Sequence, residues 1–182
     1  GEFFPCIACR SSVMAINFGQ QPFTYTPPTG YLALSTANLP DPVIDPAQGS
    51  SPEDYFNTVT YTGTGADNDI TGVGFQPDFV WIKSRGADRW HQIFDVLRGQ
   101  YNFLSSNTTN EDIYDVATLE SFDADGFNLN TSNRVNGSSE AYVAWNWKAN
   151  GSGVSNTDGS ITSTVSANTE SGFSIVSYTG TG

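Results

Sequence analysis

Acidic side chains are the residues of this chain that could most directly carry out chemistry. A β-sandwich that cleaves glycans needs two carboxyl groups about 5 to 10 Å apart, one of which serves as the acid. The run Glu-x-Asp-x-x-Glu would place such groups on one face of a strand, and none of the six glutamates stands in it. We therefore predict that the chain is not an enzyme, and keep a glycan hydrolase as a third alternative for its function.

Two oxygen-rich clusters could instead bind calcium, which takes six to eight oxygen ligands. Asp67, Asn68 and Asp69 form the first, but the bidentate glutamate that ends an EF-hand loop is missing. Asp123 and Asp125 form the second, in a turn where aspartate caps backbone amides. We expect a solvated loop and a turn, with calcium as the alternative and no other cofactor.

The cysteines and the histidine give less indication of redox, metal-binding or catalytic chemistry. Cys6 and Cys9 follow Pro5 within a strand-like stretch, whereas a redox Cys-x-x-Cys pair needs a helix N-terminus. We expect buried or locally bridged structural cysteines; a bond between chains, redox chemistry and metal binding are the alternatives. His91 has no neighbouring nucleophile in a known motif, so we expect it to pack or to hydrogen-bond.

Aromatic and asparagine side chains could interact with sugars, either by binding a glycan or by carrying one. Trp90, Tyr101 and Tyr114 lie in irregular stretches and could stack on sugar rings, with core packing as the alternative. Four Asn-x-Ser/Thr triplets are glycosylation acceptors if the protein is exported by a cell that glycosylates; unmodified turns are the alternative. The acceptor residues are Asn107, Asn130, Asn136 and Asn150.

Charge and hydropathy narrow the range of partners. The net charge is −12 over 182 residues, with seven lysines and arginines in total. Phosphate binding depends on clustered basic side chains, so we expect no nucleic-acid partner. No apolar run approaches the roughly 20 residues of a membrane helix, so we expect no membrane span.

One stretch occurs twice. Phe56–Gly65 returns as Phe173–Gly182, with seven of ten positions identical. Each copy alternates bulky and small polar residues and then reaches glycines, a pattern typical of a half-buried strand that runs into a turn. The two copies begin 117 residues apart, and a period of this length suggests tandem β domains rather than a solenoid.

The elements around the repeat predict an all-β fold. We expect strands over 75–83, 122–129 (two, around an Asp-Gly turn), 141–148 and 161–165, with Val143, Trp145 and Trp147 facing inward. Residues 90–99 fit either a strand or a short helix. Prolines make 39–54 a semi-rigid linker between 1–38 and a sandwich domain over 55–150. Residues 151–182 then read as a Ser/Thr/Gly-rich segment and the first strand of a next repeat.

Several motifs together resemble a known arrangement. They are Ala15–Phe23, Tyr25–Leu34, Asn38–Pro40, Tyr61–Gly63, Phe75–Lys83, Phe94–Asp95, Arg98–Gly99, Ser121–Phe127 and Ala144–Lys148. The chain resembles the end of a SPRY-like domain, here 1–38, followed by a tandem β domain, as in bacteriophage tail-fibre and related environmental proteins. The resemblance implies concanavalin- or jelly-roll-like antiparallel β-sandwiches with flanking partial strands. It also implies structural or receptor-binding roles outside the cell or on a virion surface.

The two ends of the chain suggest how it assembles. An N-terminal hairpin and the C-terminal strand both read as pieces of sheet with unpaired amides, and strand addition to a neighbouring molecule would cover them. Repeated head to tail, that contact builds a homopolymer. We predict a fibre subunit, with a lectin-like adhesion module as the alternative. The predicted assembly residues are Phe3, Phe4, Ile7, Ile16, Phe18, Phe173, Ile175 and Val176.

Overall fold

The computed structural model describes residues 10, 15–17, 21–32, 38–39 and 41–182. The chain divides into two compact units, Gly1–Pro42 and Val43–Gly182. In the first unit none of the described residues lies in a strand, and Ile16 is 43% exposed. The other predicted N-terminal assembly residues (Phe3, Phe4, Ile7 and Phe18), and Cys6 with Cys9, lie outside the described residues.

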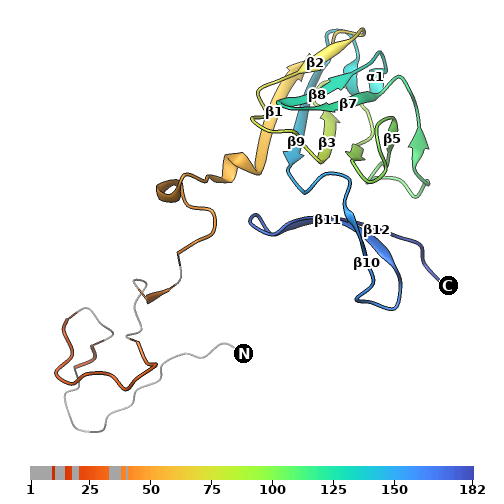
Figure 1. The fold of residues 1–182 in the computed structure, drawn as a ribbon. Helices are drawn as coiled ribbons and strands as arrows, with labels where there is room; N and C mark the ends of the chain where they lie inside the picture. Colours follow the sequence, from red (N-terminus) through yellow and green to blue (C-terminus); the bar gives the residue numbers. More distant parts are fainter. Residues whose placement is uncertain (1–9, 11–14, 18–20, 33–37, 40) are drawn as a thin grey trace. The chain divides into compact units, whose positions relative to one another are not determined.

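The second unit is all-β and antiparallel, as predicted (Figure 1). Its strands are β1 (Phe56–Thr62), β2 (Asn68–Ile70), β3 (Phe79–Ser84), β4 (Gln92–Asp95), β5 (Asn102–Phe103), β6 (Ile113–Tyr114), β7 (Leu119–Asp123), β8 (Gly126–Leu129), β9 (Ala141–Trp147), β10 (Val154–Asn156), β11 (Ser163–Asn168) and β12 (Phe173–Tyr178). One helical turn, α1 (Asn133–Asn136), precedes β9. The ambiguous stretch 90–99 contains strand β4, and the Asp-Gly turn joins β7 to β8.

Two of the sheets face each other and enclose the core. One has the order β1-β9-β3-β4 and the other β2-β8-β7. Their inner side chains form a single cluster with α1 and β5, because alternate residues of each strand point to the same face. The fully buried members are Val80, Ile82, Phe94, Phe103, Leu119, Phe127, Leu129, Val135, Tyr142 and Ala144. The arrangement is therefore a sandwich, in which β3 lies between β9 and β4.

The outer face of the first sheet carries a second set of aromatic rings. The prediction that Val143, Trp145 and Trp147 face inward is wrong: Tyr142, Ala144 and Asn146 are the buried residues of β9. The tryptophans are half-buried outside the core, where Trp145 contacts Trp81 and Trp147 contacts Phe79, with ring centroids 5.9 and 5.3 Å apart. Both faces of β9 are thus apolar, so its alternation could not indicate the inner one.

The third sheet, with the order β10-β11-β12, packs on this outer aromatic face. Phe173 of β12 stacks on Trp147 at 5.9 Å and meets Phe79 edge-on at 5.9 Å. The prediction that this strand stands alone is wrong, because six residues of β12 pair with β11. Residues 151–182 therefore lie in the same compact unit as the sandwich, and no division of the structure falls at residue 150.

The predicted linker 39–54 crosses the boundary between the two units. Its second half contains two short 3₁₀ helices, η2 (Pro46–Gln48) and η3 (Pro52–Asp54), each with proline at its start. Just after it, the Tyr55 hydroxyl donates to a Glu170 carboxylate oxygen at 2.6 Å. The start of the sandwich is thereby tied to the β11–β12 turn.

Candidate functional site

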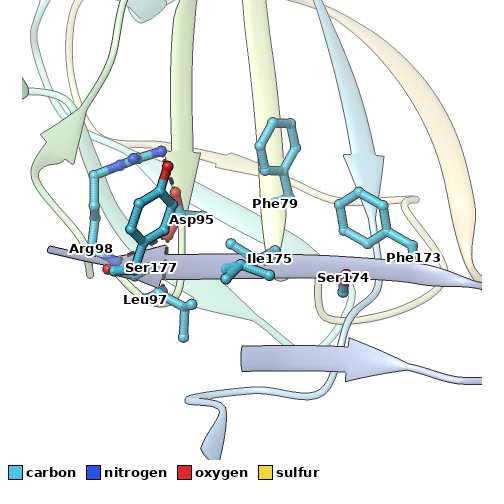
Figure 2. Close-up of a pocket in the computed structure, with 10 residues that line it drawn as sticks. Phe79, Asp95, Leu97, Arg98, Phe173, Ser174, Ile175 and Ser177 are labelled. Carbon is cyan, nitrogen blue, oxygen red and sulfur yellow. Dashed lines mark hydrogen bonds and ion pairs between the residues drawn. The ribbon is translucent and has the colours of Figure 1, made fainter. Parts of the chain in front are cut away.

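The main candidate site is the C-terminal strand β12 with the groove beside it. Figure 2 shows Phe173 and Phe79 on the same side of β12, with Asp95 and Arg98 further along the strand. The groove encloses about 420 Å³. It is lined by Phe79, Asp95, Leu97, Arg98 and residues 173–178.

The two faces of β12 have opposite surroundings. Phe173 is half-buried and Ile175 is only 9% exposed, on the face that meets the sandwich. On the other face, Val176 is 51% and Tyr178 is 67% exposed. Of the three predicted C-terminal assembly residues, the structure therefore buries Phe173 and Ile175 within the unit and leaves Val176 at the surface.

A buried ion pair forms one wall of the groove. Asp95 is 2% exposed and pairs with the Arg98 guanidinium. One carboxylate oxygen of Asp95 also accepts the backbone N–H groups of Leu97 and Arg98, at 3.0 and 2.9 Å. These contacts fix the conformation of the turn after β4, which forms this wall.

The first copy of the repeated sequence shows what its Thr-Gly-Thr-Gly turn contacts. The buried Asn136 accepts the Thr64 N–H at its side-chain oxygen and the Gly65 N–H at its backbone oxygen, both at 2.8 Å. A Cβ on Gly63 would lie 2.3 Å from the backbone oxygen of Gly137. Glycine is needed there because another backbone segment approaches so closely.

A second hollow surrounds Trp90, which is 44% exposed. Its volume is about 320 Å³, and it is lined by Asp88, Arg89, Trp90, Gln92, Asn133 and Arg134. Arg89 pairs with Glu140 at 2.7 Å, and the pKa of Glu140 is lowered mainly by this contact. The Oε1 atom of Gln92 is buried and has no hydrogen-bond partner among the described residues.

The other predicted sugar-stacking residues lie elsewhere. Tyr101 and Tyr114 meet edge-on with ring centroids 6.0 Å apart. Tyr114 is 66% exposed, whereas Tyr101 is half-buried. The structure therefore brings these two together, and the hollow at Trp90 contains neither.

The oxygen-rich clusters make structural contacts. Asn128 donates its side-chain N–H groups to Asp67 and Asp69, at 2.8 and 2.6 Å. Asp125 accepts the backbone N–H groups of Gly72 and Gly74, and these bonds lower its pKa. Within the described residues, no three His, Cys, Asp or Glu side chains are grouped so as to hold a metal ion.

The four glycosylation candidates differ in accessibility. Asn107 and Asn150 are exposed and Asn130 is half-buried. Asn136 is fully buried and donates to the backbone oxygens of Ala66 and Asn130. The prediction for Asn136 is therefore wrong: its amide organises the turn after β1, a role that the triplet alone could not reveal.

His91 has a hydrogen-bonding role, as predicted. Its Nδ1 accepts the indole N–H of Trp81 at 2.8 Å. Burial, with a smaller contribution from Lys83, lowers the pKa of His91 below its usual 6.5. The imidazole is therefore neutral at pH 7, as an acceptor must be.

None of the described helices is long and apolar enough to cross a bilayer.

Comparison with known proteins places the chain in a family. No curated protein and no solved structure matches the chain. A family model described as a domain of unknown function, DUF7483, matches residues 51–182, which includes the sandwich and the sheet β10–β12. The chain therefore belongs to the DUF7483 family.

Proposed function

We propose that this chain is a non-enzymatic structural segment of an extracellular or virion fibre, in which β-sandwich units associate end to end through β-strand contacts. The resemblance to tail-fibre proteins supports this function and its location. From the resemblance alone, we also propose that residues 1–38 belong to the end of a SPRY-like domain.

The exposed half of β12 is the observation that carries the proposal. Val176 and Tyr178 lie at the surface, whereas their counterparts in the first copy, Val59 and Tyr61, pack against the core. One edge of β12 pairs with no strand among the described residues, and apolar side chains that are exposed together on such a strand favour association with another molecule. The acidic side chains support a structural role as well, because Asp78, Asp95 and Asp125 all accept backbone N–H groups.

Electron microscopy of the whole chain tests this function. The protein is refolded at high concentration, so that strands can exchange partners, and is then imaged by negative stain. We expect end-to-end assemblies that disappear with Tyr178→Asp and persist with Ser160→Asp, a control at another exposed position. Dispersed monomers at every concentration would refute the fibre.

The hollow at Trp90 favours adhesion to glycans as a second candidate function. An exposed indole beside the guanidinium groups of Arg89 and Arg134 offers a stacking face together with hydrogen-bond donors for hydroxyl groups. Exposed Asn107 and Asn150 would in addition be the acceptors if the protein is glycosylated.

A glycan array, followed by titration of any hit by isothermal titration calorimetry, tests adhesion. We expect binding that is lost with Trp90→Ala and retained with Tyr114→Ala, which alters an aromatic pair that does not line the hollow. An array without hits, or binding that Trp90→Ala leaves unchanged, would remove this candidate.

A further inference from the structure

We propose that β12 is shared by two sandwiches. One face of it packs on the sandwich described above, and the rest of it serves a second sandwich of the same kind in the way that β1 serves the first. The partner is thus a second copy of the domain, whose β9-type strand pairs with β12. The inference rests on the proposed fibre function and names the contact between its units.

The differences between the two copies follow the surroundings of each face. Val59 and Tyr61, which pack against the core, are unchanged as Val176 and Tyr178. Thr58 lies on the opposite, exposed face of β1, and its counterpart is Ile175. This single gain of an apolar side chain occurs where β12 packs on the sandwich, so the strand has kept one interface and acquired another.

Among the described residues, the second copy has no equivalent of the partners that Tyr61 has in the first. Tyr61 stacks on Tyr142 at 5.2 Å and donates to the backbone oxygen of Val135 at 2.7 Å. Its counterpart Tyr178 is 67% exposed. A second copy of β9 and α1 would supply both contacts.

The glycines of the turn give an independent indication. Gly63 must be glycine because the backbone of Gly137 approaches it, and the sequence keeps glycine at Gly180. A Cβ on Gly180 would meet nothing within 4 Å. Thr181 and Gly182 likewise repeat residues that bond to Asn136 in the first copy. The turn is therefore suited to a second segment like 136–140.

One edge of β12 remains for the new strand. Its other edge pairs with β11, and among the described residues no strand pairs with this one. In the first sandwich β1 likewise uses one edge, pairing over seven residues with β9. The 420 Å³ groove, lined by Ser174, Ser177 and Tyr178, leaves room for side chains of the added strand.

An extended chain tests the inference. A second copy of residues 66–150 is joined directly after Gly182, which is the counterpart of Gly65, so that β12 is the only β1-type strand that the extension has. We expect the extension to fold and the amide exchange of Val176 and Tyr178 to slow at least about 100-fold relative to the natural chain. Nuclear magnetic resonance and limited proteolysis report both results.

Two matched variants decide how the extension folds. Val176→Asp should unfold the extension and leave the first sandwich intact, because Val176 is exposed in the natural chain. Val59→Asp should act in the opposite way. An unfolded extension on the unsubstituted chain overturns the inference, and so does an extension that folds while β12 still exchanges fast. Neither readout requires fibres, so failure of the fibre proposal is recognised separately by microscopy.

Discussion

The rings of Tyr61 and Tyr142 lie parallel in the core, with centroids 5.2 Å apart and an interplanar angle of 11°. Burial raises the pKa of Tyr61 well above its usual value, and mainly burial raises the pKa of Tyr142 to about 12. Both phenols are therefore neutral, and each donates a hydrogen bond near α1. This pair connects β1 to β9 and, through these hydrogen bonds, connects both strands to α1.

Tyr61→Ala should destabilise the fold strongly, whereas Tyr178→Ala should not. Removing a buried aromatic ring costs about 3 to 5 kcal/mol, while an exposed substitution usually stays within about 0.5 kcal/mol. Urea denaturation followed by tryptophan fluorescence measures both free energies of unfolding. Equal losses in the two variants would mean that Tyr178 is buried in solution.

Gly63→Ala and Gly180→Ala form a second matched pair. The new methyl group at Gly63 would collide with the Gly137 backbone, and overpacking of this kind costs about 1 to 3 kcal/mol. A Cβ at Gly180 would meet none of the described residues within 4 Å, so the midpoint of unfolding should hardly move. Thermal denaturation compares them, and an unchanged midpoint for Gly63→Ala would contradict the close approach.

Asp95→Ala should be among the most destabilising changes at an acidic residue. It leaves the partly buried Arg98 guanidinium without its partner and removes the acceptor of two turn N–H groups. Breaking one side of a buried pair costs about 3 to 5 kcal/mol. Asp88→Ala, at an exposed position, is the control for the loss of one negative charge. Chemical denaturation should separate the two variants clearly.

The stability of the fold should decrease as the pH falls through about 6.5, because of His91. Its folded pKa is lowered, so the unfolded chain takes up the proton first and protonation favours unfolding. The contribution of His91 is complete above the unfolded pKa and is lost below it. His91→Gln should flatten the unfolding free energy between about pH 8 and pH 5.5. An identical slope in the variant would show that other groups cause the dependence.

The strands could be predicted wherever a local stretch of sequence showed alternating side chains or a recognisable turn. β3 and β9 alternate over six and seven residues, and the Asp-Gly turn marks β7 and β8. The inward face of β9 could not be predicted, because large apolar side chains lie on both of its faces, Trp145 and Trp147 on one and Tyr142 on the other. The tryptophans pack outside the core, while Asn146 is buried and donates to backbone oxygens.

The pairing within the third sheet and the hollow at Trp90 could not be predicted from local sequence patterns. The strand expected over 161–165 overlaps β11, but only the structure shows that β11 pairs with one edge of β12. Arg89 and Gln92 are close neighbours of Trp90 in the sequence, whereas Asn133 and Arg134 line the hollow from α1. No local sequence pattern indicates that these two segments meet.

Successive side chains of a β-strand point to opposite faces. If each face of β12 packs on a different sandwich, neighbouring residues of this one strand therefore contact different sandwiches. Two sandwiches joined through β12 would have no flexible tether between them. Bending the junction would require separating β12 from β11, a pairing of six residues. A filament built in this way would be stiff at its joints, and the pleat of one strand would set the angle between successive units.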